Sequence, residues 1–529
     1  MFVPALVLGL FFRLAKRTNS QDISLKVDLG YSQYQGTNAA NGVRQWLGIR
    51  YAAPPVGDLR FRAAADPLLN NIVQIADAHG PLCHFTPSNT LDPNHSEDCL
   101  FLDVYAPTEN RTAKLHPVFV FIQGGGFSML SNPNFNGNSL INAGEHDLVV
   151  VTFNYRVGMW GFLASQEVKE NGDLNVGLLD QRKVLEWVQN YIHLFGGDPD
   201  HVTIGGDSAG AASVELHLTA YGGRDDGLFH AAAAESQSFG ALLTVEESQY
   251  QYNALIQRVG CAKNTDTLQC LRNTDIAVLT KNNSNIPTPG GAGSPPLFMW
   301  GPVIDRNFTT DYSYNLFSQG NFIKVPSIFG DDTNEGTIFT PSNISSVTDM
   351  DKFLKDQFAN LTQSDLKQIN TYFPESQQFS GRGVYWRAAA NAYGEIRYIC
   401  PGIFISTMLS THGQAASYNY RWDVLSPKNA ANGLGVVHTA ELQSIWGTSN
   451  APDNVSIPTI QAYWTSFIRT KDPNTYKLKS SPEWMTFNST GMGRLHFPND
   501  PTNVTMESVP ADQRARCAFF QSIGPSAQQ

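Results

Sequence analysis

Uninterrupted apolar runs in the first third of the chain predict buried strands. Residues 118–122 and 148–153 are apolar at almost every position, and residues 100–104 are apolar except at Asp103. A strand with no polar face is typical of a parallel sheet that helices cover on both sides. These runs therefore indicate the α/β fold class.

A helix, a strand, a sharp turn and a second helix follow one another from residue 181. Residues 181–195 carry apolar side chains at helical spacing, and glycines followed by Pro199 end this helix. The β-branched run 202–204 suits a strand, and the alanine- and leucine-rich residues 209–218 suit a helix. The alternation predicts a large mixed, mostly parallel sheet flanked by helices, with chemistry on the loops at the carboxyl ends of its strands.

Ser208 lies at the tip of that turn, between Gly206 and Gly210. A nucleophile elbow needs a serine on a strained turn with glycine two positions before and after it, because a Cβ there would clash with the strand or the helix. The pattern Gly-x-Ser-x-Gly is weak evidence alone, since it arises by chance about once in four chains of this length. Its place between a strand and a helix makes Ser208 a candidate nucleophile.

Composition and charge favour one globular unit that binds a small molecule. Hydrophobic residues make up 42% of the 529 residues and charged residues 16%, with no internal repeat or low-complexity linker to divide them. We expect a single domain over residues 18–529. The net charge of −11 disfavours nucleic acid and anionic membranes as partners, which leaves a small neutral molecule.

The chain begins with an apolar run, residues 2–12, which is too short to span a membrane and has the length of a secretory h-region. Arg13 follows the run, and Lys16-Arg17 also fits a dibasic processing site. We interpret residues 1–17 as a signal or processed segment. The alternative is a frayed apolar terminus.

Sequons and cysteines also favour an oxidising secretory compartment. Proximity pairs Cys83 with Cys99 and Cys261 with Cys270, although six cysteines allow other pairings and six buried thiols are the alternative. The candidate glycosylation sites are Asn94, Asn110, Asn282, Asn307, Asn343, Asn360, Asn454, Asn488 and Asn503. We expect the protein to be secreted.

Seven ordered motifs give the chain a resemblance to a known family. They lie at residues 52–55, 96–100, 124–127, 154–156, 195–199, 206–210 and 301–305. Together they resemble the type-B carboxylesterase/lipase family, which includes cholinesterases and secreted fungal esterases and lipases. The resemblance covers nearly all of the chain beyond its first thirty residues. It implies an α/β-hydrolase fold with helical insertions around an ester-hydrolysing active site.

A serine becomes a nucleophile when a base takes its proton, and a buried carboxylate orients that base. The resemblance also implies which residue is the carboxylate. In α/β-hydrolases the acid follows the serine in the chain and the histidine comes last. Glu335 follows the expected strand 325–329 and precedes a glycine, as the family's acid does. Its rivals are Asp331 and Asp332, which would otherwise lie in a solvated turn.

The base implied by the resemblance is His438. It follows the expected strand 418–422 and matches the family's histidine loop. A lone histidine is more often structural, and this is the role that we expect for His193, His217 and His230.

By the same resemblance, the backbone N–H groups of Gly125, Gly126 and Ala209 form the oxyanion hole. A glycine run lets the backbone approach a tetrahedral intermediate closely without side chains in the way. The alternative is that residues 124–126 are only a flexible loop.

Two positions near the site depart from the family's pattern. Gln123 replaces the tyrosine, histidine or asparagine associated with its position, and Asp207 replaces the glutamate that precedes the serine in cholinesterases. Neither change removes a catalytic group. Asp207 still places a carboxylate near His438, where it should favour the imidazolium and affect the pH profile.

Further residues are assigned from the resemblance by position. Arg60 and Glu97 match a buried ion pair, although a solvated pair would look identical in sequence. Cys400 and Cys517 match a long-range disulfide. Candidates for the acyl pocket, each of which could equally be a core residue, are Phe127, Phe239, Phe298, Met299 and Trp300.

The segment between Cys83 and Cys99 determines the expected substrate. Lidded lipases of the family have a long apolar loop here, and cholinesterases carry a tryptophan that binds a quaternary ammonium. The segment 84–98 is short and mostly polar, with one aromatic residue, Phe85, and a candidate glycan at Asn94. We therefore predict a serine hydrolase of soluble short to medium acyl esters, with no cofactor and no metal.

Two alternatives stay open. One is a lipase or sterol esterase of the same family. The other is a catalytically silent adhesion module, because the same fold serves cell-surface binding proteins in which the nucleophile is typically lost. Here the serine, acid, base and oxyanion glycines are all retained, which favours an enzyme.

Overall fold

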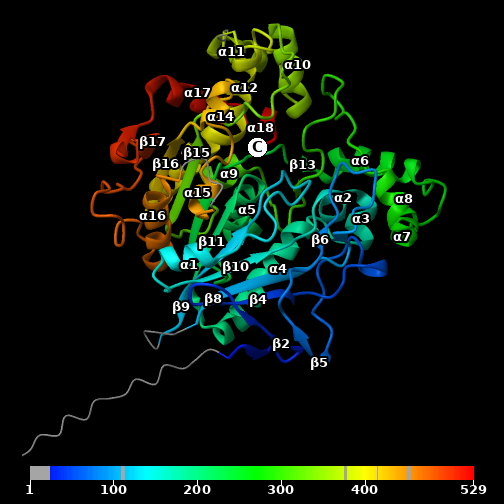
Figure 1. Ribbon diagram of the computed structural model, residues 1–529. Helices are drawn as coiled ribbons and strands as arrows, with labels where there is room; N and C mark the ends of the chain where they lie inside the picture. The colour runs from blue at the N-terminus through cyan, green and yellow to red at the C-terminus, as the bar shows by residue number, and fades with distance from the viewer. Residues whose placement is uncertain (1–23, 109–113, 375–377, 414, 449–453) are drawn as a thin grey trace, which may run out of the picture.

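The computed structural model describes residues 24–108, 114–374, 378–413, 415–448 and 454–529 (Figure 1). The expected signal or processed segment 1–17 and the sequon at Asn110 lie outside the described residues. Within the described ranges, no helix combines the length and the apolar character that a membrane crossing requires.

An 11-stranded sheet forms the centre of the molecule. In spatial order its strands are β18 (Thr505–Ser508), β17 (Gly493–Pro498), β16 (Ser417–Asp423), β15 (Ser327–Asp332), β12 (Ala231–Glu235), β11 (Gly197–Asp207), β9 (His116–Ile122), β10 (Val149–Phe153), β8 (Phe101–Pro107), β4 (Val43–Arg50) and β3 (Thr37–Asn38). The strands from β17 to β10 in this order are parallel, and the outer pairings are antiparallel. The predicted mixed, mostly parallel sheet is confirmed.

Apolar side chains fill both faces of this sheet, which explains the uninterrupted apolar runs. Along β9, Val118 and Val120 join one core cluster, whereas Phe119 and Phe121 join the other. Helices α4 (Val176–Tyr191) and α5 (Ala209–Gly223) contribute to the first cluster, and α1 (Asn138–Ala143) and α16 (Ile457–Thr470) to the second. The helix expected at 181–195 thus begins earlier, and its last residues form the 3₁₀ turn η2 (Ile192–Phe195).

The remaining elements surround the sheet as insertions and small pairings. Short strands are β1 (Lys26–Asp28), β2 (Ser32–Gln35), β5 (Asn70–Ile75), β6 (Leu82–Cys83), β7 (His95–Ser96), β13 (Leu243–Thr244) and β14 (Val303–Ile304). The other helices are α2 (Gly158–Phe162), α3 (Gln166–Asn171), α6 (Val245–Arg258), α7 (Thr267–Asn273), α8 (Ile276–Lys281), α9 (Ser313–Ser318), α10 (Val347–Gln357), α11 (Gln363–Tyr372), α12 (Trp386–Gly394), α13 (Cys400–His412), α14 (Pro427–Ala431), α15 (Leu442–Ile445), α17 (Ala511–Ser522) and α18 (Gly524–Ala527). A π-helical turn, η3 (Glu395–Ile399), joins α12 to α13, and 3₁₀ turns lie at η1 (Gly57–Leu59) and η4 (Pro501–Asn503).

Two groups of insertion helices lie apart from the N-terminal strands. Figure 1 shows α10, α11 and α12 together at the top of the view and α6, α7 and α8 at the right, whereas β2 and β5 lie at the bottom. Helices α10 to α13 and α17 share a third core cluster of their own. A disulfide between Cys400 and Cys517 joins α13 to α17 within it.

Two further disulfides, Cys83–Cys99 and Cys261–Cys270, close the short loops. The side chain of Arg60 lies between these loops and is 6% exposed. Its Nε and Nη2 each donate to a Glu97 carboxylate oxygen at 2.6 Å. Its Nη1 donates to the carbonyl oxygens of Leu271, Arg272 and Thr274 at 2.8, 3.0 and 2.9 Å. Arg60 and Glu97 therefore form a buried pair rather than a solvated one.

Candidate active site

Ser208 stands at the turn between β11 and α5, as the elbow pattern predicts. Its backbone has φ 56° and ψ −117°, a region that residues with a Cβ rarely occupy. A Cβ at Gly206 would lie 2.6 Å from the carbonyl oxygen of Ile122, and a Cβ at Gly210 would overlap the same oxygen. Only glycine therefore fits on both sides of this strained turn.

The structure brings the three residues expected from the resemblance into one hydrogen-bonded chain. The His438 Nε2 lies 2.7 Å from the Ser208 Oγ, and its Nδ1 lies 2.5 Å from the Glu335 Oε2. Glu335 is fully buried, and its Oε1 accepts the N–H of Asp332 at 2.7 Å. With a proton on Nδ1 facing the carboxylate, Nε2 is left free to accept the serine proton.

The rival acids do not lie in a solvated turn, and this alternative is wrong. Asp331 and Asp332 end strand β15 and are 3% and 0% exposed. Burial raises the pKa of both carboxyl groups well above the usual range. Of the three acids in this segment, only Glu335 hydrogen-bonds to His438.

The histidines expected to be structural lie elsewhere. His193 is exposed in η2. The buried His217 hydrogen-bonds to Gln181 through its Nε2 at 3.1 Å, and burial lowers the pKa of His217 to about 3. The His230 Nδ1 accepts the N–H of Val202 at 3.2 Å. None of these three bonds to Ser208.

Ser236, which the sequence did not single out, and the rival acid Asp332 hold the segment after His438. The Ser236 Oγ accepts the N–H of Thr439 at 3.0 Å. The Asp332 Oδ2 accepts the N–H of Ala440 at 3.0 Å and the hydroxyl of Ser236 at 3.1 Å. These three hydrogen bonds fix the backbone on the C-terminal side of the histidine.

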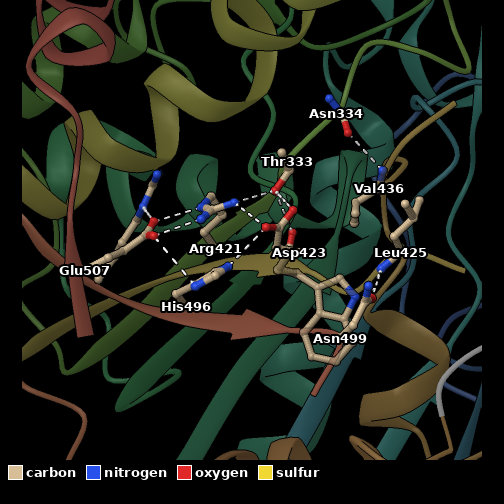
Figure 2. A network of polar contacts seen from close by, with 11 residues as sticks. Thr333, Asn334, Arg421, Asp423, Leu425, Val436, His496, Asn499 and Glu507 are labelled. Carbon is tan, nitrogen blue, oxygen red and sulfur yellow. Dashed lines mark hydrogen bonds and ion pairs between the residues drawn. The ribbon is translucent and has the colours of Figure 1, made fainter. Parts of the chain in front are cut away.

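Asn334 holds the segment before the histidine. Its Oδ1 accepts the N–H of Val436 at 3.0 Å, a contact that Figure 2 shows. Its own N–H donates to the carbonyl of Val436 at 2.8 Å. Because Asn334 directly precedes Glu335, one turn carries the acid and also holds the segment that carries His438.

A polar network anchors that turn to the edge of the sheet (Figure 2). Arg421 donates to the Thr333 Oγ1 at 2.9 Å and, through two nitrogens, to the Glu507 carboxylate at 2.8 Å each. The Asp423 Oδ1 accepts the Thr333 hydroxyl at 2.7 Å. Burial opposes the ionisation of Glu507, but Arg421 and Arg494 outweigh it and lower its pKa to about 2. The Glu507 carboxylate is therefore charged at physiological pH and faces the Arg421 guanidinium.

The glycine run after β9 lies beside the elbow. The N–H of Gly124 donates to the Asp207 Oδ1 at 2.8 Å. Within the described ranges, no hydrogen bond uses the N–H groups of Gly125, Gly126 or Ala209. A Cβ at Gly125 would overlap the carbonyl of Met129, so this backbone cannot carry a side chain. Three donors thus remain available next to Ser208.

Asp207 is a buried carboxyl group held between two loops. Its Oδ1 accepts from Gly124, and its Oδ2 accepts the Asn132 side-chain amide at 2.8 Å. Burial raises the pKa of Asp207 to about 6, against the opposing effects of these hydrogen bonds and of His438. Gln123, the other departure from the family's pattern, donates to the carbonyl of Phe153 at 2.9 Å and is buried.

A narrow cavity with a volume of about 50 Å³ begins at the oxyanion loop. Gly126 lines it, whereas Ser208 does not. Of the five acyl-pocket candidates, four line this cavity: Phe127, Phe239, Phe298 and Trp300. Met299 does not line the cavity, and its sulfur accepts the N–H of Ile286 at 3.1 Å.

The short disulfide loop, residues 84–98, does not contact this cavity and packs against other parts of the molecule. None of its residues lines the cavity. Thr86 donates its hydroxyl to the Asn283 Oδ1 at 2.7 Å and its N–H to the carbonyl of Ser128 at 2.8 Å. The His84 ring lies 5.3 Å from that of Trp160. The loop is therefore fastened at several points along its first half.

The sequons within the described ranges are accessible to different degrees. Asn282 is half-buried, and its Nδ2 donates to the carbonyl of Val278 at 2.9 Å. The exposed ones are Asn94, Asn307, Asn343, Asn360, Asn454, Asn488 and Asn503.

Comparison with known proteins places this geometry in a family context. A model of the carboxylesterase family matches residues 24–519. Secreted lipase 4 of Gibberella zeae is 29% identical over 512 residues, which cover 90% of each chain. Para-nitrobenzyl esterase of Bacillus subtilis is 29% identical over 517 residues, which cover 93% of this chain and 98% of that protein. The crystal structure of EstA from Aspergillus niger matches with a TM-score of 0.92 at 42% identity, over 95% of this chain and 99% of EstA.

Proposed function

Because this chain belongs to the carboxylesterase family and is an α/β-hydrolase that hydrolyses carboxylic esters, we propose that Ser208, His438 and Glu335 are its catalytic triad. The observation that carries this assignment is the continuous path of hydrogen bonds at 2.7 and 2.5 Å from Ser208 through His438 to Glu335. The comparisons favour ester hydrolysis over the silent adhesion module.

The proposed reaction passes through an acyl-enzyme. The Ser208 Oγ attacks the ester carbonyl carbon while the His438 Nε2 takes its proton. The N–H groups of Gly125, Gly126 and Ala209 stabilise the tetrahedral oxyanion. His438 then gives the proton to the leaving alcohol, and a water molecule activated in the same way releases the acid.

Labelling tests the nucleophile directly. An organophosphonate should modify the wild-type protein once, and Ser208→Ala should abolish labelling and lower kcat by about 10⁴- to 10⁶-fold. Ser213→Ala is the matched control, because Ser213 is buried in α5 and bonds to the carbonyl of Ala209. Activity of Ser208→Ala within tenfold of wild type would contradict the assignment.

The substrates that we propose are soluble esters of short to medium acyl chains. The cavity beside Gly126 is narrow, and the disulfide loop is short and fastened to Asn283 and Ser128. The test is the rate of tributyrin hydrolysis across its solubility limit. A smooth saturation curve supports an esterase, whereas a jump in rate at the emulsion threshold would assign a lipase, the activity named for the Gibberella zeae relative.

We also propose that the protein is secreted, with its catalytic domain spanning residues 18–529. Three disulfides and the resemblance to a secreted lipase support this localisation. The exposed sequons, Asn94 among them, are the proposed glycosylation sites. Mass spectrometry of the protein expressed in a secretory host tests both secretion and glycosylation. The mass of the secreted chain after glycosidase treatment shows where it begins, and the change in mass on that treatment shows whether the sequons carry glycans.

A further inference from the structure

Arg397 is a buried cation without an anionic partner. Five arginines in the described part of the chain are about nine-tenths buried or more: Arg60, Arg156, Arg272, Arg397 and Arg494. Three of them face a carboxylate, namely that of Glu97, Asp180 or Glu507, and Arg272 donates to two carbonyl oxygens. Among the described residues, the Arg397 guanidinium has neither kind of partner, and its Nε has no hydrogen bond.

The guanidinium of Arg397 lies in the wall of the cavity that begins at Gly126. Its central carbon is 5.1 Å from the ring centroid of Phe298 and 5.7 Å from that of Tyr398. The Tyr398 ring in turn lies 4.4 Å from the His438 ring. Cation–π contacts of this kind offset part of the cost of burying a charge. Tyr398 also hydrogen-bonds to the guanidinium, whereas its Nε donor has no partner.

The backbone around Arg397 is built to place it there. Arg397 and Tyr398 belong to η3, the π-helical turn between α12 and α13, and such turns occur frequently at functional sites. The carbonyl of Arg397 accepts the N–H of Phe239 at 2.7 Å, which fixes the turn against another cavity residue. At Gly240 a Cβ would lie 3.3 Å from the Arg397 Nη2, so the absence of a side chain there leaves room for the guanidinium.

A second ionisable group in the cavity wall, Glu215, is mostly protonated at pH 7. Burial raises the pKa of Glu215 to about 8, and its Oε1 accepts the Ser313 hydroxyl at 3.1 Å while its Oε2 is unpaired. A protonated carboxyl group donates a hydrogen bond and does not neutralise a cation. The cavity wall therefore offers one positive charge and hydrogen-bond donors, but no negative charge from Glu215 at neutral pH.

We propose that this cavity receives acyl groups that carry a carboxylate, and that Arg397 binds this carboxylate as the specificity-determining residue. The substrates are then half-esters of short dicarboxylic acids. The inference rests on the proposed function, because the reacting carbonyl must sit at Gly125 and Gly126 for its acyl chain to enter the cavity. A guanidinium binds a carboxylate through two parallel hydrogen bonds, which selects this group over a methyl group of similar size.

Matched pairs of ethyl esters test the inference on the wild-type enzyme. Monoethyl succinate, glutarate and adipate are compared with ethyl butanoate, pentanoate and hexanoate by pH-stat. We expect the half-ester of at least one pair to have a kcat/KM about tenfold or more above its neutral partner. Free glutarate should also inhibit hydrolysis of p-nitrophenyl butyrate at concentrations at which pentanamide, which has no carboxylate, does not.

Variants then assign the preference to Arg397. Arg397→Met should lower kcat/KM for the favoured half-ester by about 30-fold or more and change it for the neutral partner by less than threefold. Arg397→Lys should restore part of the difference. Arg469→Met is the control, because Arg469 lies in α16 with its guanidinium over the Tyr476 ring.

Failure of the inference and failure of the proposed function would give different results. If the wild type hydrolyses the neutral esters but prefers none of the half-esters, and glutarate inhibits no better than pentanamide, then Arg397 only stacks on its rings and the inference is wrong while the proposed function stands. If neither series is hydrolysed and Ser208 resists the organophosphonate, the proposed function itself fails.

Discussion

The two sides of Ser208 are built by different means. On the base side, the side-chain oxygens of Ser236, Asp332 and Asn334 accept backbone N–H groups on both sides of His438 and fix this backbone. On the acyl side, the wall of the cavity consists mostly of glycines and nonpolar side chains, with Arg397 as its isolated cation. With the proposed roles of His438 and the cavity, the difference indicates that the base needs a fixed orientation, which directional bonds supply, whereas the acyl side would select by space and charge.

Among changes that leave Ser208 in place, the largest effect should come from the carboxylate proposed to orient the base. Glu335→Gln keeps the shape of the side chain but removes the negative charge opposite the His438 Nδ1, so kcat should fall by about 10³- to 10⁴-fold with KM little changed. The measurement is steady-state hydrolysis of p-nitrophenyl butyrate. A loss smaller than tenfold would mean that orientation of the base does not depend on this charge.

A smaller effect is expected from the bond between the acid turn and the histidine segment. Asn334→Ala removes the acceptor for the N–H of Val436, and we expect kcat to fall about 10- to 100-fold while KM stays within threefold. Asn334→Asp keeps an acceptor and should recover most of the rate, and Asn321→Ala on the surface is the control. Equal losses in kcat and thermal stability for both Asn334 variants would point to a merely structural role.

On the acyl side, removal of a ring should change selectivity rather than chemistry. Phe298→Ala enlarges the cavity, so the ratio of kcat/KM for p-nitrophenyl hexanoate over acetate should rise about tenfold, with acetate itself within threefold of wild type. Trp300→Phe, a milder change in the same wall, should give a smaller rise. A parallel fall for acetate and hexanoate would show that the two sides are not separable.

The smallest effect concerns pH. Because the pKa of Asp207 is raised to about 6, this carboxyl group is mostly neutral below pH 6 and charged above it. Its charge favours the protonated base, so Asp207→Asn should shift the acidic limb of kcat/KM to lower pH by about half a unit. The gain should be visible above pH 6 and vanish at pH 5. An unchanged limb would show that Asp207 acts only through Gly124 and Asn132.

Local patterns in the sequence predicted most of the fold and Ser208, whereas the family resemblance supplied Glu335 and His438. The apolar runs at 118–122 and 148–153 became β9 and β10 because both faces of a parallel sheet are buried. The elbow is visible in sequence because the steric demand on Gly206 and Gly210 comes from the nearby turn and from β9.

What the sequence did not predict depends on contacts between distant segments. Ser236 and Thr439 are 203 residues apart, and neither residue type is unusual by itself. Asp332 was assigned to a solvated turn because charged side chains are seldom fully buried, yet it ends a central strand. Arg397 carries no motif, and its missing partner is apparent only once all the buried arginines are compared.

The Arg60 side chain joins two loops that are each closed by a disulfide. Its Glu97 partner lies just before Cys99, and its carbonyl partner Leu271 directly follows Cys270. One guanidinium therefore holds both loops close to the residues at which their disulfides close. A reducing agent that cuts either crosslink should leave the loop in place, and the same reagent should release it once Arg60 is lost. The disulfides and the Arg60 contacts thus hold the same two loops independently. The loops should tolerate the loss of either restraint alone, but they should be released once both are lost.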